Sequence, residues 1–299
     1  MVGLSKRKQY TQAFLYLFPA VFLIGLWVIY PVYGSIRMSF FTEWNLFTQE
    51  GAGFGLDNYI RVWNDSQFQL ALSNTLVYTF WVVPVSIAVS LVIAVLLSNK
   101  MRGMKVFESI FFLPYITNII AIGLAFRFIF HSRLGAITQI LSVFGIDPIG
   151  WLNDPEWALV TLIIFGVWGG LAFKIVIFMA GLQNIDPQYY QAAKIDGAGR
   201  LKTFFRISLP LLAPIVAYIS VISLIGSIKV YVEIIGIFGG GASGAGPANS
   251  ALSIVYYVYQ KFYQESLPTI AAAASVMMFG FILVITVLQL WINKKRLTV

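Results

Sequence analysis

The sequence predicts an all-α membrane protein with six transmembrane helices and both termini in the cytoplasm. Three observations support this prediction: an apolar composition, six long apolar segments and a one-sided distribution of Lys and Arg. Hydrophobic residues make up 59% of the chain and charged residues only 11%, whereas soluble domains carry about 25% charged residues. The apolar runs lack the roughly ten-residue alternation of a membrane barrel. They are therefore expected to cross the bilayer as helices, which satisfy their own backbone hydrogen bonds.

Each apolar segment is long enough for the roughly 20 residues that one crossing needs. The segments cover residues 14–36, 72–97, 107–130, 157–182, 211–233 and 268–292. The first follows a basic run at residues 6–8, as a signal peptide would, but it is too long for one and has no small-residue cleavage site. Pro84, Pro114 and Pro214 are expected to bend the second, third and fifth helices.

The orientation of the chain follows from its basic residues, because Lys and Arg accumulate in cytoplasmic loops. Of the 20 Lys and Arg residues, 13 fall on one side of the membrane. They lie before the first segment, after the sixth, and in the loops that join the second to the third and the fourth to the fifth. The opposite loops, at about residues 40–71, 131–156 and 234–267, hold eight of the 12 acidic residues. These loops are therefore assigned to the outer side. The third of them is expected to be irregular because it is rich in glycine from Gly239 onward.

Several other functions are excluded by what the sequence lacks. The basic residues lie between apolar segments and form no stripe, which argues against a nucleic-acid partner. There is no cysteine and His131 is the single histidine, so neither a metal site nor catalytic residues are expected. No P-loop occurs, so the chain is not expected to have an ATP site of its own. The glycines at 239, 241 and 244 match a dinucleotide fingerprint in spacing, but they follow a membrane helix and not a strand, so the match is rejected.

Charged residues inside the apolar segments are candidates for function, because an unpaired charge in a bilayer costs several kcal/mol. Lys174 lies well inside the fourth segment and is expected to face a polar cavity or a buried partner. Arg127 lies near an outer end and is expected to reach the headgroups. Lys229 and Glu233 are one helical turn apart and could form a local ion pair or serve function. Lys174, Lys229, Tyr231 and Glu233 are predicted to line or gate a translocation path.

The longest cytoplasmic loop has more structure than a turn needs. Residues 191–210 read QAAKIDGAGRLKTFFRISLP. Asp186 and Pro187 are a favourable N-cap and first helical residue, so a short helix over 188–196 is expected to expose Ala192 and Ala193. Gly197 then ends it, a second short helix covers 200–205, and Pro210 begins the next span. Such a loop would protrude from the membrane surface and offer a docking site to a cytoplasmic partner. The alternative is an amphipathic turn without a partner.

The same loop resembles the EAA loop of bacterial ABC-importer permeases. The family pattern is EAA, three residues, Gly, nine residues, Ile, any residue and Leu-Pro, and the spacing matches throughout, with Gln191 in place of the glutamate. By this resemblance the ATPase-coupling residues are Gln191, Ala192, Ala193, Asp196, Gly197, Arg200, Ile207, Leu209 and Pro210. Further segments are similar to the maltose-type permeases, namely residues 55–59, 111–115, 151–155, 180–183 and 239–241.

The resemblance implies a type I ABC importer permease fold, with residues 1–71 as the tail, first helix and first outer loop. Residues 72–299 would form the permease core, including a coupling loop at 183–210. The implied partners are a second permease subunit, a cytoplasmic ATPase dimer that binds ATP and Mg, and an extracytoplasmic solute-binding protein. The chain would be a multi-pass subunit of a bacterial inner membrane that imports a sugar or oligosaccharide.

Two alternatives are kept. One is an importer of glycerol 3-phosphate or another polar anion. The other is an ion-coupled secondary transporter that acts alone, for which acidic residues deep in the membrane are expected. Glu108 and Glu233, the acidic residues inside the segments, both lie at a segment end. The sequence does not name the solute.

Overall fold

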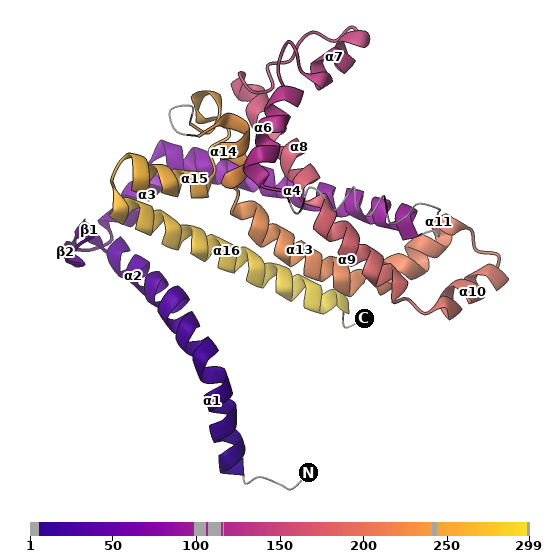
Figure 1. Ribbon diagram of the computed structural model, residues 1–299, viewed down its shortest axis with the longest axis horizontal. Helices are drawn as coiled ribbons and strands as arrows, with labels where there is room; N and C mark the ends of the chain where they lie inside the picture. The colour runs from indigo at the N-terminus through magenta and orange to yellow at the C-terminus, as the bar shows by residue number, and fades with distance from the viewer. Residues whose placement is uncertain (1–5, 99–105, 107–114, 116, 241–243, 298–299) are drawn as a thin grey trace. The chain divides into compact units, whose positions relative to one another are not determined.

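The computed structural model describes residues 6–98, 106, 115, 117–240 and 244–297. The regular secondary structure of these residues is helical apart from a two-stranded hairpin (Figure 1). Contacts divide the chain into two compact units, one made of Met1–Asp65 and Val258–Phe279 and the other of Ser66–Tyr257 and Gly280–Val299. The predicted helical class is confirmed, while the hairpin is a departure from an all-α fold.

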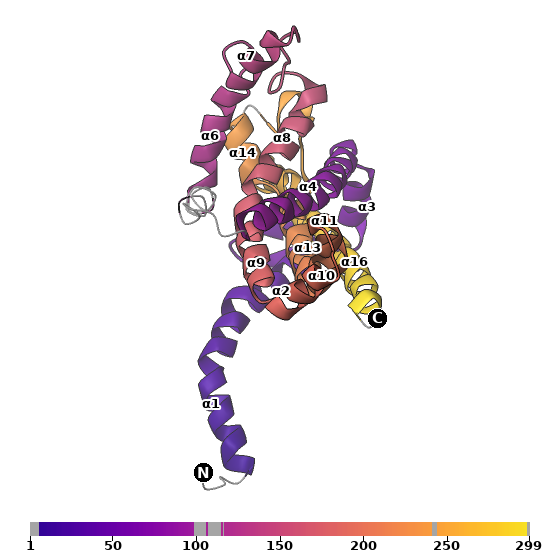
Figure 2. The same ribbon diagram turned by 90° about the vertical axis from the view of Figure 1, so that its right-hand side faces the viewer.

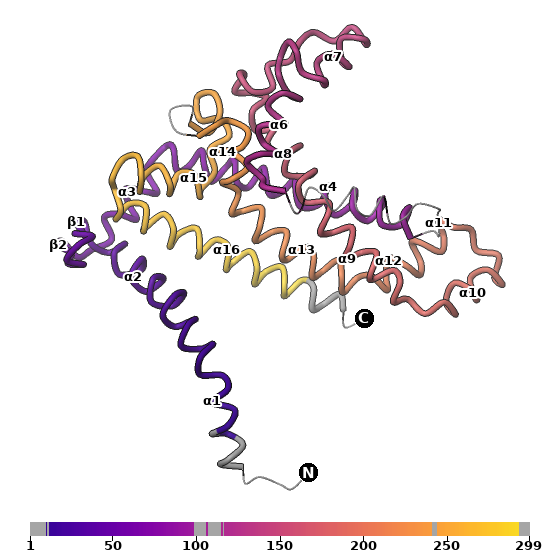
Figure 3. The backbone as a smooth tube through the Cα atoms, viewed as in Figure 1, coloured from indigo at the N-terminus to yellow at the C-terminus, as the bar shows by residue number. Residues whose placement is uncertain are grey.

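The path of the backbone can be followed along the tube in Figure 3. The first unit contains α1 (Lys6–Ile24), a π-helical turn (Gly25–Ile29), α2 (Tyr30–Ser39), β1 (Phe41–Asn45), β2 (Glu50–Phe54) and α3 (Asp57–Asn64). The second contains α4 (Ser66–Ser98), α6 (Ile119–Ile129), α7 (Ala136–Val143), α8 (Pro155–Gly169), α9 (Leu171–Gln183), α10 (Pro187–Ile195), α11 (Arg200–Thr203), a π-helical turn (Phe204–Ser208), α12 (Leu209–Leu211), α13 (Ala213–Ile228), α14 (Val232–Phe238) and a 3-10 turn (Pro247–Asn249). The remaining elements are α15 (Ile254–Tyr259), a π-helical turn (Gln260–Gln264) and α16 (Pro268–Leu297).

The described residues include four helices that are long and apolar enough to cross a membrane, or five if one bent pair is a single span. The four are Gln12–Ser39, Ser66–Ser98, Pro155–Gln183 and Pro268–Ile292. They coincide with the first, second, fourth and sixth predicted segments. Most of residues 107–116 in the third segment, with the predicted bend at Pro114, lie outside the described residues, and its described part is the 11-residue α6. Six spans and cytoplasmic termini therefore stay predictions.

The first span has an unusual surface. Within its most apolar 18-residue window, none of the residues is buried by the rest of the chain. The corresponding windows of the other three spans are between 28% and 39% buried. The rest of the first unit therefore leaves this window of the span uncovered.

The hairpin follows α2 directly. Its strands are antiparallel, with Phe41 opposite Phe54 and Asn45 opposite Glu50. Asn45 closes the turn because its Oδ1 accepts hydrogen bonds from the backbone N–H groups of Phe47 (2.9 Å) and Thr48 (3.2 Å). The outer-loop prediction contained no strand here. The missed signal was the asparagine at the start of the turn, a residue whose short polar side chain favours such local bonds.

Asn58 joins the hairpin to the helices on either side of it. This residue of α3 is buried, and its Nδ2 donates to the carbonyl oxygens of Ser39 (3.0 Å) and Phe41 (2.7 Å). The Oγ of Ser39 and the hydroxyl of Tyr59 also lie 2.6 Å apart. Asn58 and Tyr59 belong to the segment 55–59 that was singled out in the sequence. Their side chains hold the end of α2, the hairpin and α3 together.

The second unit is built around α4. In Figure 1, α9 and α13 lie along α4, and both pack against it. Their shared core consists of Ala94, Leu97, Ile175, Phe178, Met179 and Ile219. A second packing pair is α6 with α14, which lie side by side in Figure 2. Asn74 is a polar side chain of α4 in this unit, and it donates to the carbonyl oxygens of Ser250 (3.0 Å) and Leu252 (3.1 Å).

The fifth predicted segment is broken at both ends. The helical stretch Arg200–Leu211 is bent by 66° against Ala213–Ile228. Pro210 therefore lies near the end of the first stretch, and the next helix begins at Ala213. Pro214 therefore stands at the start of α13, just after the bend of this predicted segment. The predicted irregular loop after residue 234 also contains helices, including α15. Its glycine-rich part does have positive φ angles, at Gly239 and Gly240 among others.

Candidate functional site

The loop between α9 and α13 begins with a well-capped helix. The Oδ1 of Asp186 accepts a hydrogen bond from the N–H of Gln188 at 2.9 Å, and Pro187 occupies the first helical position. The predicted helix start is confirmed. The cap satisfies one of the N–H groups that every helix leaves unpaired at this end. The loop therefore enters α10 in a defined direction.

Gly197 ends α10 with a left-handed residue. Its φ is +68°. Its N–H donates to the carbonyl oxygen of Lys194 (3.1 Å), and the N–H of Ala198 donates to the carbonyl oxygen of Ala193 (2.8 Å). These bonds satisfy carbonyl groups at the helix end, as a left-handed glycine commonly allows. The predicted break at Gly197 is confirmed, and its cause is a backbone conformation that other residues adopt only with strain.

The second half of the loop is tied back to the first. The helix α11 continues through a π-helical turn into α12. The hydroxyl of Tyr190 on α10 lies 3.1 Å from the Oγ of Ser208, which is buried in that turn. The loop therefore forms two connected helical arms, with the turn at Gly197 between them.

The predicted coupling residues differ in exposure. Exposed side chains or backbone are found at Gln191, Ala192, Asp196, Gly197, Arg200 and Pro210, while Ile207 and Leu209 are half-buried. Ala193 is only 5% exposed, so the prediction that both alanines face outward is wrong for this one. Successive residues of a helix point about 100° apart, so two neighbours rarely share one face.

The loop exposes large apolar side chains that the sequence prediction did not single out. Tyr189, Ile195, Leu201 and Phe205, termed here the loop surface, are 52%, 87%, 76% and 61% exposed. Exposed basic residues stand among them, including Lys194 and Lys202. Large apolar side chains that face away from their own chain commonly mark a contact with another protein. These side chains could have been found from the sequence, because large apolar residues are not needed to form a turn in a polar loop.

Lys174 is buried inside the fourth span. Its side chain is 6% exposed, and its Nζ donates to the carbonyl oxygen of Gly170 at 3.0 Å. Gly170 is the residue between α8 and α9. The buried partner of Lys174 is thus the backbone oxygen of Gly170. No ion pair to Lys174 is found among the described residues.

Lys229, Tyr231 and Glu233 lie around a second interruption, between α13 and α14. Lys229 is exposed and follows the last residue of α13. The Oε2 of Glu233 accepts a hydrogen bond from the N–H of Tyr231 at 3.2 Å, which caps the start of α14. The described residues contain no Lys229–Glu233 ion pair, because the helix that would place these side chains one turn apart ends between them.

The described residues include no group of three or more His, Cys, Asp or Glu side chains that could hold a metal ion.

The sequence matches a family model described as "Binding-protein-dependent transport system inner membrane component" over residues 71–298. The chain belongs to this family. The match begins after the first span and its outer loop and includes all the residues of the loop between α9 and α13. With its four or five apolar spans, this family member is a multi-pass membrane protein.

Curated relatives match along almost the entire chain. The lactose transport system permease protein LacF of Rhizobium radiobacter is 32% identical over 97% of this chain and 97% of its own length. The arabinooligosaccharides transport system permease protein AraP of Bacillus subtilis is 33% identical over 92% of this chain and 87% of its own. The trehalose/maltose transport system permease protein MalF of Thermococcus litoralis is 28% identical over 98% of both chains. The resemblance to sugar-type importer permeases is thus confirmed.

Solved structures confirm the fold. A chain of a bacterial ABC transporter involved in import of the acidic polysaccharide alginate has a TM-score of 0.79 and 24% identity, covering 96% of both chains. The alginate ABC transporter in complex with an alginate pentasaccharide-bound periplasmic protein gives the same TM-score and identity, covering 94% of this chain and 93% of its own. The inner membrane component therefore has the fold of an ABC importer permease. Its family favours a transport subunit over an ion-coupled transporter acting alone.

Proposed function

We propose that this chain is the permease subunit of an ATP-driven importer that carries a sugar or oligosaccharide across a bacterial inner membrane. The named functions of its relatives, which transport lactose, arabinooligosaccharides and trehalose or maltose, support a saccharide as the cargo. The partners proposed with it are a second permease subunit, a cytoplasmic ATPase dimer that binds ATP and Mg, and an extracytoplasmic solute-binding protein. Six spans with both termini in the cytoplasm complete the proposed topology.

The observation that carries the proposal is the exposed apolar loop surface on the side where basic residues gather. In the proposed mechanism, the ATPase dimer closes when ATP binds, the two helical arms of the loop transmit that motion, and the pathway opens outward. Hydrolysis resets the assembly. The ATPase must bind one permease state more tightly than the other, because equal affinity for both would shift nothing.

Ile195→Glu is expected to weaken binding of the ATPase and to reduce ATP-dependent uptake by about tenfold. Ile195 is 87% exposed, so the variant loses no core packing. Burying an unpaired carboxylate against a partner, however, costs several kcal/mol. One measurement is co-purification of the ATPase with the tagged permease. The other is uptake of radiolabelled saccharides, both neutral (lactose and maltose) and acidic (digalacturonate), into cells that express the whole transporter.

The matched control is Val143→Glu, which adds the same charge to a side chain that is 81% exposed at the end of α7. This control is expected to retain the ATPase in full. Equal ATPase recovery with Ile195→Glu and the unmodified protein would contradict a docking role for the loop surface.

We propose further that Lys174, Lys229, Tyr231 and Glu233 line or gate the pathway. Lys174 is hydrogen-bonded at the interruption between α8 and α9, and the other three lie around the interruption between α13 and α14. In many transporters, interrupted membrane helices form the substrate site because they present unpaired backbone groups and helix ends to a polar solute. This geometry supports the assignment.

Lys174→Met is expected to lower uptake at least about fivefold without lowering the melting temperature of the purified permease. Methionine fills a similar volume, and it removes a buried charge whose presence in a membrane costs about 3 kcal/mol. A purely structural lysine would show the opposite combination, with a reduced melting temperature and normal uptake per folded molecule. Uptake and thermal unfolding of the same preparation distinguish these outcomes.

A further inference from the structure

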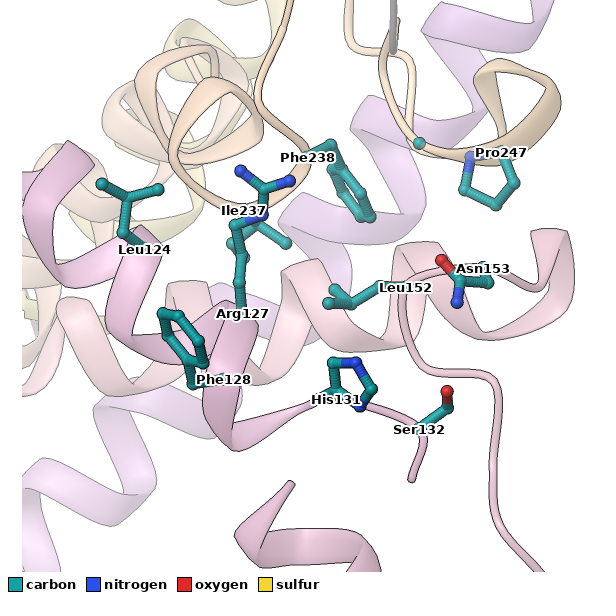
Figure 4. Close-up of a pocket in the computed structure, with 11 residues that line it drawn as sticks. Leu124, Arg127, Phe128, His131, Ser132, Leu152, Asn153, Ile237, Phe238 and Pro247 are labelled. Atoms are coloured by element: carbon teal, nitrogen blue, oxygen red, sulfur yellow. The ribbon is translucent and has the colours of Figure 1, made fainter. Parts of the chain in front are cut away.

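A cavity of about 620 Å³ lies within the second unit, at the end of α6 that the charge distribution places on the outer side (Figure 4). Its wall comes from four stretches: 124–132 at the end of α6 and just after it, 152–153 before α8, 237–238 at the end of α14, and 246–247 at the 3-10 turn. Segments far apart in the sequence therefore meet around one space. None of the predicted pathway residues lines it.

Arg127 gives this cavity a positive charge. It is half-buried, and it lines the cavity at the end of α6. Figure 4 shows its guanidinium group beside Phe238. Among the described residues, no carboxylate forms an ion pair with it. A partly buried guanidinium without a counter-charge favours an anion from outside the chain.

The backbone leaves room for such an anion next to the guanidinium. Gly239 has a φ of +90°, and a Cβ at this position would lie 3.4 Å from Nη1 of Arg127. Any other residue would be strained at this φ, and its Cβ would stand in van der Waals contact with the guanidinium. Glycine keeps the approach to Arg127 open.

Neutral donors line the rest of the polar wall. The Nδ1 of His131 accepts hydrogen bonds from the N–H groups of Arg133 and Leu134, both at 3.2 Å. A ring nitrogen that accepts carries no proton, so the Nε2 of this imidazole carries the hydrogen and is a donor. The hydroxyl of Ser132 and the amide of Asn153 also line the cavity. In Figure 4, these three side chains stand apart from the guanidinium of Arg127.

The remaining wall is apolar, with the rings of Phe128 and Phe238 and the side chain of Pro247 among its members. A cavity of this size, largely apolar with a few separated polar groups, is typical of a site for a small organic molecule. Flat apolar surfaces suit the C–H faces of sugar rings, while hydroxyl groups need separated donors and acceptors. A bare inorganic ion would use one corner of this space and leave the rest empty.

We propose that this cavity binds an anionic saccharide, with its carboxylate or phosphate group on Arg127 and its hydroxyl groups on His131, Ser132 and Asn153. The inference rests on the proposed importer function and narrows its cargo from saccharides in general to acidic ones. Arg127 selects the acid because a guanidinium can form two parallel, charge-assisted hydrogen bonds with a carboxylate or a phosphate. A neutral sugar would leave this group unpaired.

The test measures binding to the purified full-length permease in lipid nanodiscs by isothermal titration calorimetry. Digalacturonate is compared with galactobiose, and glucose 6-phosphate with glucose, so that the carboxylate and phosphate sources are separated. At least one acid is expected to bind tenfold or more tightly than its neutral counterpart. Arg127→Gln is expected to remove that preference, and Arg127→Lys to retain part of it.

The matched control is Arg133→Gln, which loses the same charge from an exposed side chain in the same stretch but does not line the cavity. The ratio of its affinities for the acid and for the neutral sugar is expected to stay within twofold of that ratio in the unmodified protein. Equal affinity for acid and neutral sugar, undetectable binding of both acids, or an equal loss in Arg133→Gln would each overturn the inference. ATP-dependent uptake of a neutral sugar in the absence of any acid preference would leave the proposed importer function standing.

Discussion

Gly197→Val is expected to reduce ATP-driven uptake by at least about tenfold while the permease still inserts and folds. Gly197 has a φ of +68°, a conformation that costs an ordinary L-residue about 1–2 kcal/mol and a β-branched one more. No other atom lies within 4 Å of the position where a Cβ would stand, so crowding plays no part. The strain is relieved when the turn rearranges, which moves the arm that carries Leu201 and Phe205 away from the arm that carries Ile195.

Gly199→Val is the matched control for this change. It adds the same side chain two residues later in the same loop, again with no atom within 4 Å. Its backbone is extended, with φ −70° and ψ 163°, a conformation that valine adopts readily. Uptake and ATPase co-purification are expected to be close to normal. If both variants were impaired to the same extent, the left-handed turn would not be the feature on which coupling depends.

Gly123→Val is expected to destabilise the second unit. A Cβ on Gly123 would lie 2.5 Å from the backbone Cα and carbonyl carbon of Gly236, where α6 and α14 pack against each other. The obstacle is backbone, so no side chain can turn aside and the two helices must separate. Overpacking of this kind costs about 1–3 kcal/mol, which corresponds to a fall in melting temperature of roughly 2–12 °C.

Gly226→Val in α13 provides the comparison, because no atom lies within 4 Å of its added Cβ. Valine is slightly better than glycine inside a helix, so its melting temperature is expected to be unchanged or a little higher. Thermal unfolding of both variants in one detergent measures the difference. A melting temperature for Gly123→Val equal to that of Gly226→Val would show that α6 and α14 are not in backbone contact.

Local chemistry explains which features could be predicted from the sequence. The spans at 14–36, 72–97, 157–182 and 268–292 follow from apolar length alone. The helix start at Asp186 and the turn at Gly197 follow from residues that act on their own backbone. These features depend on neighbours within a few positions along the chain. They therefore persist whatever the rest of the fold does.

Other features depend on tertiary contacts or on where helices end. The burial of Ala193 is decided by which face of α10 meets the protein, and the packing of Gly123 on Gly236 requires two segments more than 100 residues apart in the sequence. The expected pairing of Lys229 with Glu233 assumed one continuous helix, whereas the chain breaks between them. The outer cavity could not be predicted because four separate segments form it.

The bare surface of the first span has a consequence for how this protein tolerates change. Because none of the residues in its most apolar window is buried, no packing within the first unit constrains the shape of these side chains. The family model likewise begins only at residue 71. Substitutions in this window are therefore expected to be limited by the hydrophobicity that a membrane span needs, and not by side-chain shape. The hairpin and Asn58 join the end of this span to α3 within the same unit.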